Sequence, residues 1–539
     1  MRQEKPAFRF QSKIANKKSE ISPFLTALLV LISLYSSAQD SGDAAAKNGE
    51  QARRAFLQCW RYGQGWLEHA DPTSGLLPRN LSRDFYWNAR DAAADNYPFL
   101  VLTTFFTDRF LFEGRMKIML EAEQRLCNRV DRLPDDFVFA TQSFRTPEAK
   151  LSDLIFGASE YVKDGLLPLT EWLGPSPWAD RMIGLVDDVW KHADIETEAG
   201  PVPAQSHEVA GDLMQSLCRL YWMTGNDQYR EYAFRLADYF LIYHSPIEVD
   251  SLQLDDHGCE VIGGLSEAYF LAAQKAPDKH RQWQSTMHKI LDRILEVGRD
   301  QNGLLYSRVN PKTGEKLTDD MTDNWGYNYN AFLVVADLDN EPRYREAVEF
   351  VLKNLPKVTD YDWERGSADG YADSLEGGLN LMNRIYLPEA VEWADHVVEK
   401  MLAIQRDTGI VEGWHGDGNF ARTALMYALW KTQGAYLEPW RADLRLGAAR
   451  HEDGTFHFQV SADWPWSGKI RFDIPRHAEY LHLPADYPRL NQFPEWFTVP
   501  KEGAYESNQG ELPAAQLREG IAVTVQPKEP VKVTLKRKS

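Results

Sequence analysis

Apolar residues recur three and four positions apart along most of the chain, which is the spacing of a helix with one buried face. Leu213, Leu217 and Leu220 follow this spacing, and so do Ile262 and Leu265. Apolar helices of this kind begin near residues 84, 152, 207, 257, 325, 371 and 417, and a second, more charged helix follows after a short turn. We therefore predict a mainly α-helical chain that repeats one pair of helices.

The turns inside these pairs are short and resemble one another. Residues 226–231 are similar to residues 340–346: Asn caps a helix, acidic residues occupy its first turn, and Pro342 is tolerated where the backbone N–H has no partner. No polar end-capping repeat is visible, so a closed ring fits better than an open array. We predict an (α/α)6-type toroid over residues 50–440, with six pairs and an extra helix at one end; seven pairs remain an alternative.

The pattern changes after residue 440. Residues 455–460, 469–474, 521–525 and 531–535 alternate apolar and polar side chains, as half-buried strands do. We predict a small antiparallel β domain over residues 441–539, with a hairpin joining its last two strands. Its loop from Arg476 to Trp496 is expected to cover the toroid or to pack against its side.

The N-terminus has the features of an export signal. Six Lys and Arg residues precede the apolar run from Phe24 to Tyr35, and Ser36, Ser37 and Ala38 supply small residues at a cleavage site. Twelve apolar residues are few for a membrane span, so a cleaved signal over residues 1–38 is favoured over a retained anchor. Residues 39–49 are expected to form a flexible lead-in, and the mature protein is expected in the periplasm or outside the cell.

Charge and cysteine content narrow the possible partners. The net charge of −19 argues against nucleic acid, and against an anionic membrane surface once the signal is removed. The four cysteines are far apart, lack metal-ligand spacing and sit in apolar helical patterns, which favours buried thiols and leaves one disulfide open. Glycine-rich phosphate motifs are also missing. We expect no metal and no cofactor.

The starts of the apolar helices share an unusual composition. Each carries an acid or a His beside Gly and aromatic residues, and in a ring of helix pairs all inner helices open at the same end. These stretches would then meet in one acidic, aromatic-lined bowl, an arrangement suited to sugars. The stretches begin at Asp84, His207, Asp255, Asp323, Asp369 and Trp414.

Hydrolysis of a glycosidic bond uses two carboxyl groups on opposite sides of the bond, one as acid and one as base or nucleophile. Asp323 and Asp373 are favoured for these roles. Asp323 precedes a run whose Asn side chains can hold hydroxyls and whose rings can stack, and Asp373 shares a helical face with Glu376. Helix capping by Asp323 and a solvated pair of first-turn charges are the alternative interpretations. The run after Asp323 contributes Asn324, Trp325 and Tyr327 as candidate substrate contacts.

Three further clusters are candidates for substrate contact. Asp212 lies inside a strongly apolar helix, where an acid is costly unless it faces a cavity or a partner. Arg90 in the first helix could clamp a sugar carboxylate, or could simply balance nearby Asp. Helix capping is the alternative for Asp256. The clusters are His207, Glu208 and Asp212; Asp256 and His257; and Trp414, His415 and Asp417.

These motifs give the chain a resemblance to the six-hairpin glycosidases, and within them to the unsaturated glucuronyl hydrolases and related uronidases. Residues 211–229 resemble the Asp-bearing inner helix of that family, which would place its catalytic acid on Asp212. Residues 324–328 stand where the family carries an aromatic loop, and Asp373-Ser374 is similar to its Asp-Ser helix start. The chain lacks the family's Arg before the Gly and its His-Asp-x-Gly-Phe stretch, so a different exo-acting uronidase fits as well.

We therefore expect an exported glycoside hydrolase that acts on poly- or oligosaccharides containing uronic acid, with its catalytic pair drawn from Asp212, Asp323 and Asp373. One alternative is a polysaccharide lyase that uses Asn324, Tyr327, Tyr329 and His207. Another is a non-catalytic toroid that binds carbohydrate. The sequence does not indicate the sugar, the stereochemical outcome or the oligomeric state.

Overall fold

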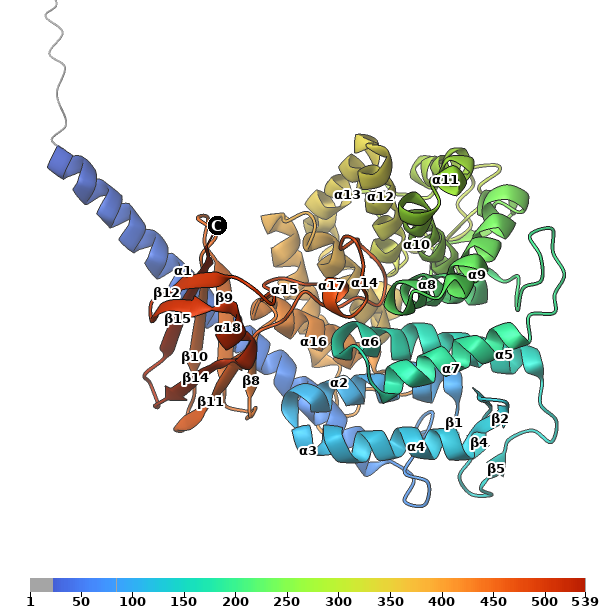
Figure 1. Cartoon of the computed structure of the whole chain (residues 1–539), viewed down its shortest axis with the longest axis horizontal. Coiled ribbons are helices and arrows are strands. Elements are labelled where there is room, and N and C mark those ends of the chain that lie inside the picture. The colour runs from blue at the N-terminus through green and yellow to red at the C-terminus, as the bar shows by residue number, and fades with distance from the viewer. Residues whose placement is uncertain (1–22, 84, 539) are drawn as a thin grey trace, which may run out of the picture.

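The computed structural model describes residues 23–538 apart from residue 84, with side chains from residue 42 onward. Asp84 and all six basic residues of the expected export signal therefore lie outside the described residues. Helices form a ring, and a β domain sits beside it (Figure 1). Among the described helices, none combines the length and the apolar character needed to cross a membrane.

The inner wall of the ring consists of helices that are buried on nearly every side, as α12 is, because neighbours surround them. Several are joined end to end through π-helical turns. The inner helices are η1 (Ala89–Asn96) with α2 (Tyr97–Thr107), α5 (Leu151–Glu160) with η3 (Tyr161–Leu166) and α6 (Leu167–Leu173), α8 (His207–Thr224), α10 (Cys259–Lys275), α12 (Trp325–Asp339), α14 (Ala368–Met382) and α16 (Asn419–Lys431).

The outer helices are amphipathic, with one apolar face against the inner wall and charged residues toward solvent. Each follows its inner partner after a short turn. They are α3 (Arg109–Leu111) with η2 (Phe112–Met116) and α4 (Lys117–Leu126), α7 (Pro177–Lys191), α9 (Asp227–Asp238) with η4 (Tyr239–Tyr243), α11 (Pro277–Val297), α13 (Pro342–Asn354) with η6 (Leu355–Val358), and α15 (Pro388–Ala403).

Six inner–outer hairpins thus follow one another from residue 89 to residue 403, and the predicted toroid is confirmed. One more pair closes the ring: α16 packs against α1 (Pro23–Glu68), so the two ends of the helical region supply one helix each. Inner helix α16 also packs against α2, which completes the circle. All inner helices therefore begin at the same end of the ring.

Glycines let neighbouring inner helices approach closely at two places. A Cβ on Gly326 of α12 would lie 2.5 Å from the backbone of Gly377 of α14, and a Cβ on Gly211 of α8 would lie 2.2 Å from the backbone of Glu260 of α10. Only glycine fits such contacts. Gly211, Glu260 and Gly326 lie near the starts of their helices, whereas Gly377 lies in the second half of α14. The two contacts also draw together the polar residues next to them.

The β domain is a pair of packed antiparallel sheets. One has the order β13-β12-β15-β10-β9, the other β14-β11-β8, and apolar residues such as Phe458 and Val533 fill the space between them. The strands are β8 (Tyr436–Glu438), β9 (Arg445–Arg450), β10 (Phe456–Ser461), β11 (Trp466–Arg471), β12 (Ala504–Ser507), β13 (Gly510–Pro513), β14 (Ile521–Val525) and β15 (Val531–Arg537), with helices α17 (Arg476–Glu479) and α18 (Ala514–Glu519) between them.

Two expectations about the chain's ends need correction. Strands β14 and β15 do not pair as a hairpin, because they belong to different sheets. Residues 39–49 are helical and belong to α1: Ala45 is buried, and the Asn48 Nδ2 donates to the Ala448 carbonyl at 2.8 Å. Three consecutive alanines favour helix there, and β9 offers a surface on which it packs.

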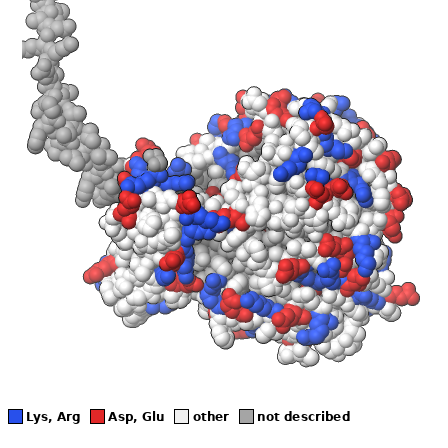
Figure 2. Space-filling view, in the orientation of Figure 1, with Lys and Arg blue, Asp and Glu red and all other residues white. Residues whose placement is uncertain are grey.

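The remaining elements are short and lie in loops. They are β1 (Tyr86–Trp87), β2 (Asn128–Val130), β3 (Leu133–Pro134), β4 (Phe137–Val138), β5 (Ser143–Phe144), η5 (Pro246–Glu248), β6 (Leu252–Gln253), β7 (Arg308–Val309) and η7 (Trp363–Gly366). The four cysteines are buried and unpaired. Figure 2 shows acidic and basic side chains interspersed over the face in view.

Candidate active site

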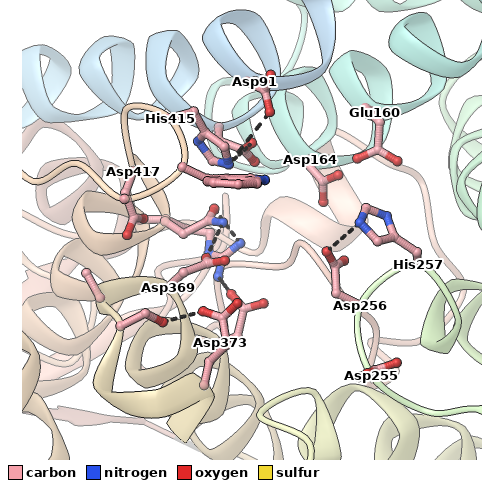
Figure 3. Close-up of a pocket in the computed structure, with 18 of the residues that line it drawn as sticks. Asp91, Glu160, Asp164, Asp255, Asp256, His257, Asp369, Asp373, His415 and Asp417 are labelled. Atoms are coloured by element: carbon pink, nitrogen blue, oxygen red, sulfur yellow. Dashed lines mark hydrogen bonds and ion pairs between the residues drawn. The ribbon is translucent and has the colours of Figure 1, made fainter. Parts of the chain in front are cut away.

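A cavity of about 760 Å³ opens at the end of the ring where the inner helices begin. Its walls come from the first turns of α10, α12, α14 and α16, the loops before them, and the π-helical turns η1 and η3 (Figure 3). Carboxylates outnumber Lys and Arg by more than two to one. The carboxylates are Asp91, Asp95, Glu160, Asp164, Asp255, Asp256, Glu260, Glu364, Asp369, Asp373, Glu412 and Asp417; the others are Arg90, Lys163, Arg308, Arg365 and Arg422.

One wall centres on Arg422 of α16, which is almost completely buried. Its Nη2 donates to Asp373 Oδ1 at 2.5 Å and lies 2.8 Å from Glu376 Oε2. The Asn324 amide donates to Asp373 Oδ2 at 2.9 Å, and the Tyr327 hydroxyl donates to Glu376 Oε2 at 2.6 Å. We call these five residues the arginine wall. Two neutral donors and one guanidinium hold its two carboxylates.

This arrangement follows from the close approach of α12 and α14. Gly326 and Gly377 touch, so the residues on either side of them in sequence pair across the two helices. Such spacing on one helix face brings Asn324 opposite Asp373, and Tyr327 opposite Glu376. Burial raises the pKa of Glu376, although Arg422 acts against this. Asp373 reaches the cavity, whereas Glu376 lies behind it without solvent contact.

The opposite wall is built on η3 and centres on Lys163. Its Nζ lies 2.8 Å from Asp164, 3.3 Å from Glu260 and 3.8 Å from Asp212. We call Glu160, Lys163, Asp164, Asp212 and Glu260 the lysine wall. It places four carboxyl groups around one ammonium group, so the wall carries more negative charge than Lys163 can balance.

Protonation of some of these carboxyl groups reduces the excess negative charge. Burial, and then the charge of Asp212, raise the pKa of Glu160 well above its usual range. Burial alone would raise the pKa of Asp164 too, but Lys163 and a hydrogen bond with Glu160 outweigh it and leave that pKa lowered. Burial raises the pKa of Asp212 strongly, and both of its oxygens lack a hydrogen-bond partner among the described residues. Glu160 and Asp212 of the lysine wall therefore keep their protons at neutral pH.

Asp256 and His257 lie on the loop before α10, next to the lysine wall (Figure 3). His257 contacts Glu208 through Nδ1 and lies 3.2 Å from Asp256 Oδ2 through Nε2. The hydrogen bond with Glu208 raises the pKa of His257 to about 10, so the imidazole is charged. Desolvation within the bowl raises the pKa of Asp256 to about 7, even though solvent reaches its side chain and His257 acts against the shift.

A third group of titratable residues also lines the cavity. His415 Nε2 is 3.7 Å from Asp91 and 3.6 Å from Asp95. Burial raises the pKa of Asp417 to about 6, with His415 lowering it, and burial beside Asp373 raises that of Asp369 well above its usual range. Several acids of the cavity are thus held neutral near pH 6 to 7, as acid catalysis requires.

Strained backbone gathers at this cavity. His257 (φ 66°), Glu364 (φ 43°), Arg365 (φ 59°) and Asn491 (φ 56°) line it, and all have left-handed backbone without being glycine. Such conformations are costly and concentrate at functional sites. This supports the cavity as the functional site of the molecule.

The structure brings eight of the expected site residues to the cavity and keeps seven off its lining. On the lining are Arg90, Asp256, His257, Tyr327, Asp373, Trp414, His415 and Asp417. Behind it or elsewhere are Asp212, Asp323, His207, Glu208, Asn324, Trp325 and Glu376.

Asp212 and Trp325 differ most from expectation. Asp212 has no solvent-exposed surface and lies behind Lys163, and Trp325 is part of the core, where its indole N–H donates to Ser374. Neither is placed to touch a sugar. Glu208 and Asn324 instead contact the lining residues His257 and Asp373 from behind. Burial and the charge of Asp373 raise the pKa of Asp323.

Sequence reasoning missed Glu160, Lys163 and Asp164, which lie in the middle of a helix and not in a loop. Four charged residues, these three and Glu171, interrupt the mainly apolar run of residues 154–173 and were the available signal. Sequence reasoning placed the stretches that contain Asp369 and Asn419 in the bowl without giving either residue a role. It missed Arg422, and it missed Leu490 and Asn491 of the β domain, which line the cavity from far along the chain.

The residues suggested for a lyase are occupied elsewhere. The Tyr329 hydroxyl donates to the Gly303 carbonyl at 2.6 Å inside the core, and Asn324 holds Asp373. His207 does not line the cavity, and burial lowers its pKa. Tyr327 reaches the cavity, but its hydroxyl is bonded to Glu376.

Two groups could offer three ligand atoms each to a metal ion, with these atoms within 4.8 Å of one another. They are Asp91, Asp95 and His415, and Glu160, Glu208 and His257. His257 of the second group is charged and already pairs with Glu208 and Asp256. His415 of the first group lies 3.6 Å from Asp95.

No protein-family model and no curated protein matches the chain. Solved structures with a similar fold include an alpha-1,6-mannanase from Salegentibacter sp. HEL1_6 (11% identity, 71% of this chain and 98% of that one, TM-score 0.39). They also include cellobiose 2-epimerase from Bacillus thermoamylovorans B4167 (12%, 51% and 87%, TM-score 0.38). A third is the unsaturated glucuronyl hydrolase of Bacillus sp. GL1 (14%, 53% and 86%, TM-score 0.37). The last comes from the family that the sequence motifs resemble.

Proposed function

We propose that this protein is an exported glycoside hydrolase in which Asp373 and Asp256 act on the bond from opposite sides of the cavity. The observation that carries the proposal is the contrast between these two carboxyl groups. Arg422 and Asn324 each donate a hydrogen bond to one oxygen of Asp373, whereas Asp256 has a pKa of about 7 and keeps its proton in a large fraction of molecules. Figure 3 shows them facing the cavity from different sides.

The chemistry assigned to each group follows from this contrast. Asp256 donates its proton to the oxygen of the leaving group, and Asp373 acts as the base or nucleophile on the other face of the sugar. Asp369 and Asp417 lie beside Asp373 and keep protons at slightly acidic pH, so they add little negative charge to that wall. The rim carries Trp414, 71% exposed, as a surface on which a sugar ring can stack.

The charge of the cavity favours a neutral sugar over a uronate. Among its arginines, Arg90 lies 3.9 Å from Asp91 and Arg308 lies 3.9 Å from Asp255, so both already face a carboxylate. A sugar carboxylate would enter near Asp91 and Asp164, whose pKa values are lowered so that both stay ionised, and these two groups would repel it. We therefore propose a neutral glycan as the substrate. A uronate-containing glycan serves as the comparison substrate in the test below.

A screen of oligosaccharides for new reducing ends tests the proposal. We expect neutral glycans to be cleaved faster than uronate-containing ones. Asp373→Asn should lower turnover by a factor of about 10² to 10⁴, the range of acid–base catalysis, while oligosaccharide binding is retained. The control is Asp319→Asn, a surface residue paired with Lys316, which should leave turnover unchanged. Full activity of Asp373→Asn would contradict the assignment.

A second candidate reaction is proton transfer at a carbon of a free sugar, as in an isomerase or epimerase. The specific observation is that two histidines, His257 and His415, line the same cavity from different loops, each beside carboxylates. Such a reaction yields an isomer of unchanged mass and no new reducing end. Mass spectrometry and chromatography of the same screen separate the two reactions.

A further inference from the structure

One segment of the β domain enters the ring and ends at the cavity. We call residues 476–496 the plug; in Figure 1 it crosses the ring together with α17. Its apolar residues, among them Tyr487 and Phe493, belong to the core of the toroid and not to that of the β domain. The plug is therefore an integral part of the helical ring.

The plug passes along the ring from the ends of the inner helices toward their starts. It contacts Glu171 near the end of α6 and Arg219 in the second half of α8. Its residue Leu490 packs with Cys259 and Tyr327, which lie in the first turns of α10 and α12. The tip thus reaches the starts of the inner helices, where the cavity lies. It closes the cavity on the side that faces the ends of the inner helices.

Buried ion pairs fix the plug in this position. The Arg489 guanidinium donates to both oxygens of Glu171 at 2.8 and 2.9 Å, and the Tyr487 hydroxyl donates to Glu267 at 2.8 Å. Arg219 of α8 donates to the backbone carbonyls of Leu490 and Asn491. These groups have almost no exposed surface. Charges buried with such partners set one geometry, because any displacement would leave them unpaired.

The tip itself forms the floor of the cavity. Leu490 and Asn491 line it. The Asn491 amide donates to the Lys163 carbonyl at 2.8 Å and approaches Asp164 Oδ1 at 3.4 Å, so the tip also holds the η3 turn that carries the lysine wall.

From this geometry we infer that the plug restricts the enzyme to the ends of saccharide chains, with Leu490 as the floor of the site for the terminal sugar. The inference rests on the proposed hydrolase function. A chain can enter the cavity from the open end alone, because the plug fills the way through the ring. An internal sugar would need an exit for the rest of the chain on both sides. The terminal sugar is therefore the unit that fits against Leu490, and the β domain completes the site.

Binding measurements on the full-length Asp373→Asn variant test this inference separately from turnover. The probes are a neutral oligosaccharide that the screen identifies as a ligand and the same compound with a bulky group on its terminal sugar. We expect the blocked compound to bind at least tenfold more weakly. Equal binding of both compounds would overturn the inference. If no oligosaccharide binds, the proposed function itself fails, and with it the inference.

Variants of Leu490 test whether this residue forms the floor of the site for the terminal sugar. In the same background, Leu490→Phe should shorten the cavity and weaken binding of the unblocked compound at least tenfold, whereas Leu490→Met, with nearly the same volume, should bind it as before. Thermal unfolding of both variants shows whether the ring stays intact. If Leu490→Phe folds normally and binds as tightly as Leu490→Met, then Leu490 is not the floor of the site.

The products of the wild-type enzyme give an independent readout. On an oligosaccharide labelled at its reducing end, action at chain ends releases one small product and a ladder that shortens from the unlabelled end, or the mirror image of this ladder if the other end enters. Internal fragments at the first stages of reaction would overturn the inference while leaving the hydrolase function standing.

Discussion

The arginine wall and the lysine wall face the same cavity but balance charge in opposite ways. In the arginine wall, two carboxylates share one guanidinium, and each has a hydrogen-bond donor within 3 Å. In the lysine wall, four carboxyl groups surround one ammonium group, and the Asp212 carboxyl group has no hydrogen-bond partner among the described residues. One wall therefore keeps negative charge and the other keeps protons. The proposed base Asp373 belongs to the first wall, and the proposed acid Asp256 lies beside the second.

Removing the cation of the arginine wall should have the largest effect on stability. Arg422→Met leaves Asp373 and Glu376 without their buried partner, and breaking such a pair costs about 3–5 kcal/mol. Urea unfolding measures the change. Arg441→Met, which breaks the more exposed pair with Asp443, is the control and should cost about 1 kcal/mol or less. A similar small value for Arg422→Met would show that the wall does not hold its charge as described.

Replacing a residue of the lysine wall should change stability in the opposite direction, because Asp212→Asn is expected to stabilise the protein. Asp212 has a pKa raised by burial, so the folded protein binds a proton there that the unfolded chain releases above about pH 4. Stability from this site is thus lost as pH rises toward the raised pKa. Asp212→Asn cannot ionise and should make the protein more stable at pH 7 relative to wild type, by about 1.4 kcal/mol or more, the value of one pKa unit.

Unfolding curves of wild type and Asp212→Asn at pH 4.5 and pH 7 check this difference. The gain should be larger at pH 7, and turnover should stay within tenfold of wild type because Asp212 does not line the cavity. A variant that is less stable at pH 7 would mean that Asp212 is ionised and paired with Lys163. A loss of turnover without a loss of stability would restore the catalytic role expected from the sequence.

Replacing His257 tests whether this histidine sets the pKa of Asp256, the proposed acid. The charge of His257 lowers the pKa of Asp256, so replacing it by Gln should raise that pKa further. Because the acid works in its protonated form, the fall of kcat/KM at alkaline pH should move to higher pH in His257→Gln. A shift toward lower pH would contradict the pairing of these two side chains.

The rim should matter least. Trp414→Ala removes a ring that is 71% exposed, and stacking on such a ring is worth about 0.5–1.5 kcal/mol. We expect KM to rise by a factor of about 2 to 13 with kcat nearly unchanged. A large fall in kcat would place Trp414 next to the reacting bond instead of at the rim.

The same contrast explains what the sequence could reveal. Apolar spacing predicted the helix pairs, and acids at helix starts pointed to Asp373, Asp256 and Asp417 on the cavity lining. These residues are recognisable because loops and first turns of inner helices must face one end of a ring. Spacing within one helix could also relate Asp373 to Glu376.

The sequence predicted that residues 476–496 would cover the toroid or pack against it, but the lysine wall and the path of the plug to the cavity were beyond such reasoning. Which face Glu160, Lys163 and Asp164 present depends on the π-helical turn η3, which shifts the helical phase that sequence spacing assumes. Leu490 reaches the cavity through a segment more than 300 residues from Asp164, held by ion pairs whose partners no local pattern links. The same distance hides the role of Asp212, whose burial behind Lys163 depends on contacts between helices.

The pH dependence of kcat/KM in wild type and in Asp256→Asn tests most directly whether Asp373 acts as the base and Asp256 as the acid. For wild type we predict a rise in kcat/KM as the base ionises and a fall near pH 7, where Asp256 loses its proton. Asp256→Asn should be slowed by a factor of about 10² or more and should lose the alkaline fall. An Asp256→Asn enzyme that keeps both its rate and the alkaline fall would contradict the account.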